Sequence, residues 1–387
     1  MGTDSTRRNI LRGGLAVAGL GALGIPDWLM PALAQGEAVI PFTDLPATFP
    51  APANDRRTYD LRRINGPFTP KDEFFTTQHY GHPVIDPAAF RLKVSGLVNR
   101  PLSLSLEALR GIGTSDLVAG FECSGNRRPL QGASSNGRWT GVPLRDVLEE
   151  AGVKGEGREF VFFGADHGQE EVEFRTQKFT VDQQFGRSLP RDKALSADPF
   201  VAWALNGEPL TRHQGSPLRL IVPGWYGVAN VKWLSEIHVQ EDQYLGKYQA
   251  RWYRTLRGEM INGEMKWTEA AVTTMQLKSF LARVTRDAGG RVTVLGVALN
   301  DGTPFKSVEI RIDDGPWQAA TWDPSTRSKY SWKLFTFVWN GATPGEHTLV
   351  SRVTDVNGKV QPTAEELETK KTFLEDNSQH PRKVVLT

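Results

Sequence analysis

The residues of this sequence best suited to chemistry surround its only cysteine. Cys123 stands in the segment Phe-Glu-Cys-Ser-Gly-Asn-Arg-Arg, which covers residues 121–128. Ser-Gly-Asn is typical of a tight turn. Nearby cationic charge favours a thiolate over a thiol, and a thiolate is a soft metal ligand. The two residues that end the segment, Arg127 and Arg128, could also hold an anionic cofactor or substrate.

A single thiol limits the kinds of site that the chain can build. One cysteine in 387 residues allows no internal disulfide, no Cys-x-x-Cys metal site and no Cys-x-x-Cys-His haem attachment. A lone cysteine is ordinarily a small buried hydrophobic residue, which is the alternative to a chemical role. The turn and the adjacent arginines favour the chemical role for Cys123.

The N-terminus has the three parts of an export signal for folded proteins. The pair Arg7-Arg8 is followed by an uncharged stretch from Gly13 to Pro26, and then by Ala32-Leu33-Ala34, a small-residue cleavage site. The uncharged stretch is too short to span a bilayer. We therefore expect residues 1–34 to be a twin-arginine signal peptide and the mature protein to lie in the periplasm. Export in the folded state suits a chain that receives a cofactor first.

The composition excludes some classes of function. The 46 basic and 44 acidic side chains give a net charge of +2 at pH 7. There is also no basic stripe with interleaved aromatic residues, so a nucleic-acid-binding protein is not expected. No second apolar run has transmembrane length. The length and the 11 tryptophans fit two packed domains.

The expected first domain, residues 35–245, has the texture of an α+β fold. Its Pro-rich start, residues 35–70, fits an extended arm. Without a regular βαβα alternation or a G-x-G-x-x-G fingerprint, a dinucleotide-binding fold is disfavoured. Alternation of apolar and polar residues and helix-end signals predict strands at 90–98, 159–164, 200–205, 218–222 and 231–239, and helices at 105–110 and 143–151.

The expected second domain, residues 273–387, follows a connector at residues 246–272. Strand-like runs alternate with turn signals such as Asn340-Gly341. Within one run, Val308 and Ile310 share a face while charged residues occupy the other, which is typical of an immunoglobulin-like β-sandwich. The segment contains no chemical motif, so a structural or interface role is expected. The predicted strands are 291–299, 307–313, 333–339 and 347–354.

Several segments, in order, resemble the sulfite oxidase family of molybdenum enzymes. The cysteine loop is one of these, and the resemblance covers most of the mature chain. Several ordered blocks are more specific than any single motif. The trailing sandwich resembles the dimerisation domain of that family, so a homodimer is expected. The other segments are Phe-Phe-Thr-Thr-Gln-His at 74–79, Phe-Gly-Arg-Ser-Leu-Pro at 185–190, Asn-Gly-Glu-Pro-Leu at 206–210, Gly-x-Pro-x-Arg at 215–219, Val-Pro-Gly at 222–224 and Val-Lys-Trp-Leu at 231–234.

The resemblance implies a cofactor, molybdenum held by the dithiolene of one pyranopterin, by oxo groups and by the Cys123 thiolate. One protein sulfur is enough because the organic cofactor supplies two more. The sequence has no haem-attachment motif, so the resemblance implies no haem in this chain and a separate c-type cytochrome as electron acceptor. By position, the residues that would bind the pterin and its phosphate are Gln78, His79, Arg187, Ser188 and Lys232.

The resemblance also implies oxygen-atom transfer to sulfite. Arg128 would belong to a cage of arginines around that anion, and Trp139 would line the substrate pocket. Two candidate catalytic positions depart from the family pattern. Thr77 stands where the family has a second cage arginine, and Trp203 stands where it has an active-site tyrosine. Both changes make the pocket less cationic, and an indole N–H can donate a hydrogen bond but accept none.

These departures leave three readings of the sequence. The leading one is a periplasmic molybdenum oxidoreductase with sulfite as its substrate. A second keeps the cofactor but reduces a neutral S-oxide or N-oxide, which would not need the second arginine. A third is a metal-free secreted binding protein on the same scaffold, against which the retention of Cys123, Arg128, His79 and Lys232 argues. Tungsten in place of molybdenum fits the same residues.

Overall fold

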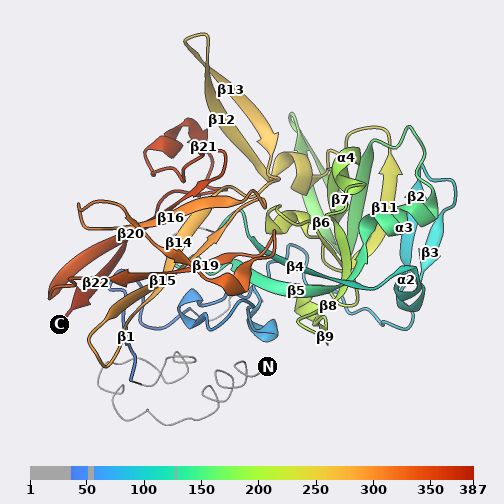
Figure 1. Ribbon diagram of the computed structural model, residues 1–387. Helices are drawn as coiled ribbons and strands as arrows, with labels where there is room; N and C mark the ends of the chain where they lie inside the picture. The colour runs from blue at the N-terminus through green and yellow to red at the C-terminus, as the bar shows by residue number, and fades with distance from the viewer. Residues whose placement is uncertain (1–35, 51–55, 127–128) are drawn as a thin grey trace.

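The chain folds into two β-rich lobes that lie side by side (Figure 1). The structure, a computed structural model, describes residues 36–50, 56–126 and 129–387. The expected signal peptide therefore lies outside the described residues. Within those ranges, no helix is both long and apolar enough to cross a membrane. The α+β class is confirmed, because short helices α2 (Leu106–Ile112), α3 (Leu144–Ala151) and α4 (Arg191–Ala194) accompany sheets in the first lobe.

Two five-stranded sheets build the first lobe. The strand order in one is β10-β8-β5-β4, with β9 beside β8, and in the other it is β3-β2-β11-β6-β7. Strands β2 and β11 run parallel, while the other pairs are antiparallel. The strands are β2 (Leu92–Gly96), β3 (Leu102–Leu104), β4 (Ser115–Glu122), β5 (Ser134–Pro143), β6 (Glu159–Phe174), β7 (Gln177–Pro190), β8 (Phe200–Leu205), β9 (Glu208–Pro209), β10 (Arg219–Ile221) and β11 (Leu234–Gln240).

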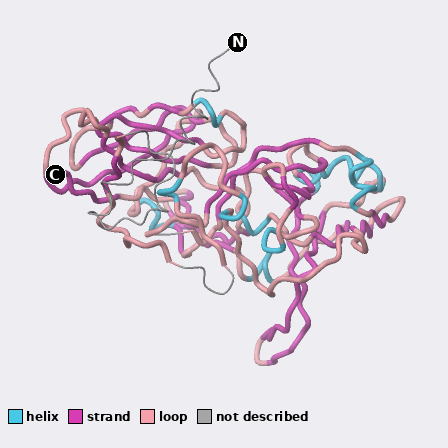
Figure 2. Tube along the Cα trace, turned by 90° about the horizontal axis from the view of Figure 1, so that it is seen from below, coloured by secondary structure: helices cyan, strands magenta, loops and turns pink. Residues whose placement is uncertain are grey.

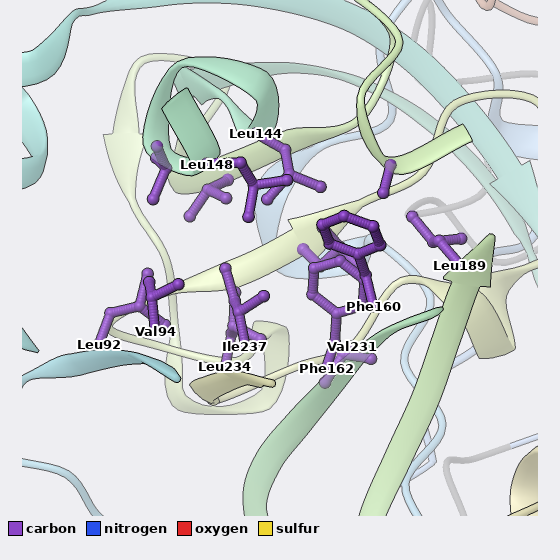
Figure 3. Close-up of a cluster of buried hydrophobic side chains, with 14 of the residues drawn as sticks. Leu92, Val94, Leu144, Leu148, Phe160, Phe162, Leu189, Val231, Leu234 and Ile237 are labelled. Carbon is purple, nitrogen blue, oxygen red and sulfur yellow. The ribbon is translucent and has the colours of Figure 1, made fainter. Parts of the chain in front are cut away.

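The main core of this lobe lies between the sheets and helices α2 and α3. Figure 3 shows Leu92 and Val94 from β2 beside Ile237 from β11. Helix α3 buries one face because its apolar residues recur at helical spacing, and it ends at Gly152, whose φ of 68° is the left-handed conformation that glycine adopts at low cost. The other residues labelled in that core are Leu144, Leu148, Phe160, Phe162, Leu189, Val231 and Leu234.

The second lobe is the expected sandwich of two sheets. Val308 and Ile310 are buried in its core, as predicted from their alternation with charged residues. One sheet has the order β1-β14-β15-β19-β18 and the other β17-β16-β20-β22. The strands are β14 (Lys278–Arg286), β15 (Val292–Leu299), β16 (Phe305–Ile312), β17 (Gln318–Ala319), β18 (Thr321–Trp322), β19 (Lys333–Trp339), β20 (Gly345–Asp355) and β22 (Arg382–Leu386).

The N-terminal arm is shared between the lobes. Its strand β1 (Ala38–Ile40) pairs with β14 and so completes an edge of the sandwich. Further along, Arg57 exchanges backbone hydrogen bonds with Thr76, in the segment that leads to the first sheet. The arm was expected to belong to the first domain, residues 35–245. That boundary needs correction, because the backbone groups of β1 pair with β14 at the edge of a sheet in the second lobe.

Two hairpins extend beyond the lobes. Strand β6 pairs with β11 only as far as Gly164, so its outer half pairs with β7 alone. This hairpin projects from the body of the molecule in Figure 2. The second hairpin lies in the expected connector and joins β12 (Arg254–Ile261) to β13 (Glu264–Ala271), with β21 (Lys370–Lys371) beside β12. A single turn of π-helix, Lys247–Arg251, precedes it.

Candidate active site

One cavity of about 590 Å³, counting its open mouth, gathers residues from both sheets of the first lobe. The elements meet here because β4 ends and β10 begins at this point, Phe185 of β7 faces it, and the loop before β11 crosses it. The lining residues are Phe75, Thr76, Thr77, Gln78, His79, Phe121, Cys123, Asp166, Phe185, Arg219, Gly227, Val228, Asn230, Lys232, Trp233 and Tyr253.

The cysteine lies at the start of a tight turn directly after β4. The Asn126 N–H donates to the Cys123 carbonyl (2.8 Å), and the Cys123 N–H donates to the Ala133 carbonyl (2.9 Å). The predicted Ser-Gly-Asn turn is therefore confirmed. The Asn126 side chain fixes the turn further, since it donates to Glu122 (2.9 Å) and accepts from the Ala133 N–H (3.0 Å). The turn presents the Cys123 thiol to the cavity.

Burial raises the pKa of the Cys123 thiol, while a backbone hydrogen bond from Gly125 and the charge of Arg56 oppose that rise. Without a metal the sulfur is therefore protonated at neutral pH. A bound metal inverts this preference, because a coordinated thiol loses its proton. The side chain is thus suited to metal ligation, while burial disfavours its use as a free nucleophile.

Two cations line the cavity, Arg219 at the start of β10 and Lys232 in the loop before β11. Arg219 donates to the carbonyls of Gln214 (3.0 Å) and Asn230 (3.1 Å), and its guanidinium lies 5.0 Å from the ring centre of Trp139. Burial lowers its pKa to about 9. The Lys232 ammonium contacts the His213 carbonyl (3.3 Å), and burial, with the charge of Arg219 second, lowers its pKa to about 7. Together they make the cavity a site for an anion.

The loop that holds Lys232 is backed by a glycine and a strained tryptophan. Gly215 has a φ of 99°, and a Cβ there would lie 2.7 Å from the Cβ of Lys232. Trp233, which lines the cavity, has a φ of 49°, an unusual conformation for a bulky residue. Its indole N–H donates to the Arg212 carbonyl (3.0 Å). Backbone strain of this kind is common at functional sites.

His79 is a neutral side chain in an aromatic environment. Its Nε2 lies 2.8 Å from the Tyr253 hydroxyl, and its ring centre lies 4.2 Å from that of Tyr248 and 5.3 Å from that of Phe185. Burial lowers the pKa of His79 to about 4, and the positive charges of Lys232 and Lys247 contribute to the shift. At neutral pH the imidazole therefore offers one donor and one acceptor to its surroundings.

Asp166 adds a carboxyl group to the same cavity. It is buried, and burial raises its pKa to about 6 although the positive charge of Lys232 opposes the shift. The pKa of this acid and the pKa of Lys232 both lie close to neutral pH. Such values favour proton transfer in either direction under physiological conditions.

Five predicted site residues line the cavity: Thr77, Gln78, His79, Cys123 and Lys232. Sequence reasoning missed Arg219, Asp166, Asn230 and Tyr253, which also line it. Arg219 stands in the Gly-x-Pro-x-Arg segment that carries the resemblance, so a signal for it was present. Nothing local in the sequence marks the other three, because their side chains meet only through the strand pairings.

Two predicted pterin-binding residues, Arg187 and Ser188, do not line the cavity. Arg187 is buried, and its guanidinium donates hydrogen bonds to the backbone carbonyls of Tyr248 and Val272. The Ser188 hydroxyl donates to the Glu159 carboxylate. Both side chains therefore hold the π-helical turn and β6 in place instead of lining the cavity.

The two predicted pocket tryptophans also pack into cores. Trp139 lies beneath the guanidinium of Arg219 and donates its indole N–H to the Ala119 carbonyl (3.1 Å), so it supports the cavity from behind. Trp203 faces the main core with the guanidinium of Arg110 5.7 Å from its ring centre. The predicted cage residue Arg128 lies outside the described residues.

The cavity fits an anionic organic cofactor that carries a metal. Its donor set combines one soft sulfur, two cations and a neutral imidazole. The Thr77 Oγ1 and the Arg219 Nε are buried and have no hydrogen-bond partner within the described part of the chain, so each is available to a bound group. Cys123, as the metal ligand, and Lys232, Arg219 and His79, as phosphate or pterin contacts, would hold a molybdenum pyranopterin.

In the metal-free protein, Lys232→Met is expected to raise thermal stability at about pH 6. The pKa of Lys232 is lowered to about 7 in the fold and is about 10.4 in an unfolded chain. The charge therefore destabilises the fold below pH 7, and this effect disappears as the pH rises past the unfolded pKa. A gain of about 1 kcal/mol would raise Tm by about 2–4 °C.

Melting curves of Lys232→Met and wild type at about pH 6 and about pH 10.5 test this prediction. The difference between them should shrink at the higher pH. Lys306→Met, at an exposed lysine of the second lobe, serves as the control and should change Tm little at either pH. An equal gain at both pH values would contradict the assignment of a buried charge.

The matched family and relatives are molybdopterin-binding proteins and sulfite oxidases. Residues 79–248 match the family model described as an oxidoreductase molybdopterin binding domain. Sulfite oxidase of Gallus gallus is 31% identical over 325 residues, covering 76% of this chain and 68% of its own. Mitochondrial sulfite oxidase of Mus musculus is 27% identical and covers 90% of this chain and 67% of its own.

A solved structure has the same fold over nearly the whole chain. The sulfane dehydrogenase SoxCD from Paracoccus pantotrophus superposes with a TM-score of 0.71 and covers 97% of this chain and 96% of that one. The two sequences are 23% identical. The architecture of both lobes is therefore shared with a solved protein.

Proposed function

Because this chain belongs to the sulfite oxidase family of molybdopterin-dependent oxidoreductases, we propose that it oxidises sulfite to sulfate in the periplasm and passes the electrons to a separate c-type cytochrome. One observation carries the proposal: Cys123 meets two cations, Lys232 and the buried Arg219, in a single cavity of the matched domain. When bound, the molybdenum cofactor supplies the oxygen-atom and two-electron chemistry.

The side chains of the cavity would bind and orient the reactants. Arg219 is held by two carbonyls, so its guanidinium is fixed before an anion arrives. Lys232 adds charge that increases when a dianion binds, because the anion favours the protonated ammonium. Asp166 lines the same cavity and is placed to take up or release a proton near neutral pH.

Export by the twin-arginine route supports the periplasmic location. The signal rests on Arg7-Arg8, the uncharged stretch and Ala32-Leu33-Ala34. The separate cytochrome is inferred because this chain has no haem-attachment motif and substrate oxidation releases two electrons. A homodimer through the sandwich lobe completes the proposal and is inferred from the resemblance alone.

Metal and pterin content, measured with acceptor reduction, test the proposal. Protein from a host that makes the cofactor should contain about one molybdenum and one pterin per chain. It should also reduce ferricyanide when sulfite is added. Loaded protein that instead oxidises dimethyl sulfide or trimethylamine in the reverse assay, or reduces their oxides, would assign the S-oxide or N-oxide reaction. A folded protein without molybdenum would support the binding-protein reading.

Thr77→Arg is expected to improve sulfite oxidation. Thr77 lines the cavity with a buried hydroxyl that has no partner among the described residues, so a guanidinium there would face the bound anion. A hydrogen bond to a charged group contributes about 1.5–3 kcal/mol, which corresponds to a fall in KM of about tenfold or more.

Steady-state kinetics with sulfite check this prediction, and Thr180→Arg provides the control. Thr180 is exposed on the projecting hairpin, so the Thr180→Arg substitution adds the same charge outside the cavity. An unchanged KM in Thr77→Arg would argue that sulfite does not bind beside residue 77. A gain in both variants would point to long-range steering instead.

A further inference from the structure

The projecting hairpin of β6 and β7 carries an exposed apolar face. Val172 pairs with Phe179 across the strands, and Phe174 and Val181 are each two residues from a member of that pair. Side chains two residues apart, or directly opposite, lie on the same side of a strand pair. Phe174 is 67% exposed, Phe179 49% and Val181 39%. We call these four residues the hairpin face.

The opposite side of the hairpin is polar. Glu171 and Lys178 form an exposed ion pair there (2.9 Å). An isolated two-stranded hairpin is marginally stable in water, and a contiguous apolar surface on a soluble protein commonly marks an interaction site. The polarity of one side and the apolarity of the other indicate that a partner covers the hairpin face.

Trp252 is connected to the hairpin face by a partly buried ion pair. Glu170 lies directly across from Val181, at the inner end of that face. Its carboxylate pairs with Lys247, and the Lys247 ammonium lies 4.1 Å from the ring centre of Trp252. The Trp252 indole is 59% exposed. The solvent-accessible apolar surface therefore includes a large aromatic ring.

A series of aromatic contacts connects Trp252 to the cavity. The ring centre of Trp252 lies 5.9 Å from that of Tyr248, which is buried. Tyr248 lies 4.2 Å from His79, and His79 reaches the Tyr253 hydroxyl. His79 and Tyr253 both line the cavity that holds Cys123. Electron tunnelling slows steeply with the gap between conjugated groups, so rings in contact shorten the path from the cavity to the surface.

We propose that the hairpin face and Trp252 form the docking surface for a one-electron acceptor, a small haem protein, and that Trp252, Tyr248 and His79 provide the shortest path to it. This inference rests on the proposed function. Sulfite and one water give sulfate, two protons and two electrons, and two ferric haems, the oxidant, each take one of the electrons in succession. The aromatic side chains shorten the gaps and are themselves neither oxidised nor reduced.

The contact path favours a redox partner over a second copy of the chain. An interface between two copies of the chain would need only apolar area. The surface around Trp252 also lies at the outer end of the series of aromatic contacts that begins at the cavity. The β12–β13 hairpin is a suitable reference for the hairpin face, because it also exposes apolar residues, Met260 (64%) and Ile261 (45%). Among the described residues, no aromatic ring contact links its Trp267, which is 45% exposed, to the cavity.

The first test replaces Phe174 and Phe179 by serine and measures binding of a small soluble ferric cytochrome c. Binding is measured on both metal-free and loaded protein. The double variant should raise Kd at least about tenfold. It should slow cytochrome reduction accordingly, while reduction of ferricyanide, which needs no docking surface, persists. Met260→Ser with Ile261→Ser is the matched control and should leave Kd unchanged.

The second test separates docking from electron transfer. In a pre-steady-state experiment with saturating cytochrome c, Trp252→Leu should slow haem reduction, Trp252→Phe should retain most of the rate, and Trp267→Leu should match wild type. Equal haem reduction in Trp252→Leu would overturn the path.

Three outcomes would overturn the docking surface. The first is an unchanged Kd in the double phenylalanine variant, and the second is no binding of this cytochrome to wild type. The third is a double variant that changes from dimer to monomer with its cytochrome reduction intact, which would assign the face to a second copy. Wild type that lacks molybdenum or does not reduce ferricyanide refutes the proposed function instead, and the binding comparison on metal-free protein still decides the docking surface.

Discussion

Cys123→Ser is expected to abolish molybdenum retention and enzymatic activity while the protein stays folded. The hydroxyl of serine is a poor ligand for a soft metal, and Cys123 is the sole cysteine of the chain. Loss of partners that only support a metal ligand already costs about 10–100-fold, so loss of the ligand itself should exceed about 100-fold. Metal analysis and ferricyanide reduction with sulfite would measure the loss.

Ser124→Ala is the matched control for that substitution. Ser124 is the next residue of the same turn, is buried, and its hydroxyl makes no hydrogen bond within the described residues. Its removal should leave metal content and activity nearly unchanged. Equal losses in the two variants would mean that the turn is merely sensitive to change. Full activity in Cys123→Ser would refute the role of Cys123 as a ligand.

Lys278→Met is expected to destabilise the protein by about 3–5 kcal/mol, because it leaves the buried Glu122 carboxylate without its partner. Lys278 comes from β14 of the sandwich lobe and lies 3.2 Å from Glu122, and both side chains are almost fully buried. Its ammonium also donates to the Asn126 carbonyl (3.1 Å). The second lobe therefore anchors both sides of the cysteine turn.

A backbone hydrogen bond from the C-terminal segment also anchors the cysteine turn. The Glu375 N–H, near the C-terminal end of the chain, donates to the Ser124 carbonyl (2.6 Å). Burial raises the pKa of Glu122, and the charge of Lys278 and a hydrogen bond from Asn126 oppose the rise. Without Lys278 the carboxyl is therefore more readily protonated, and the turn loses a fixed support. Molybdenum content should fall together with stability.

Denaturant unfolding of Lys278→Met, Glu122→Gln and the double variant tests the pair. The double variant should lose less than the sum of the two single losses, because no unpaired charge stays buried. Lys178→Met breaks the exposed pair with Glu171, whose members are 59% and 60% exposed, and should cost at most about 1 kcal/mol. A Lys278→Met loss as small as this control would show that the buried pair contributes little.

Only part of the site could be predicted from the sequence, and the reason is physical. Turn chemistry and short-range pattern act over a few residues, so the Cys123 turn and helix α3 could be predicted from neighbouring residues alone. The segments that indicated the family and its cofactor could be recognised for the same reason, because each consists of residues that are neighbours in the chain. These features required no knowledge of which strands are neighbours.

Strand pairing decided which side chains reach the cavity. Ala202 lies directly opposite Arg219, so these two residues share a face of the sheet, and Trp203, one residue on, points to the other face. Arg187 and Arg219 are both buried arginines beside apolar residues, yet only Arg219 lines the cavity.

What the sequence determined by itself was the chemistry available to this protein: a single sulfur in a tight turn, the segments of a molybdenum enzyme, and an α+β domain before a sandwich. What only the tertiary structure decided was the partnership of distant residues. It brings Asp166 and Tyr253 to the cavity and carries Lys278 across from the second lobe. Such contacts depend on register and lobe packing, which pair residues far apart in the chain and leave no local signal.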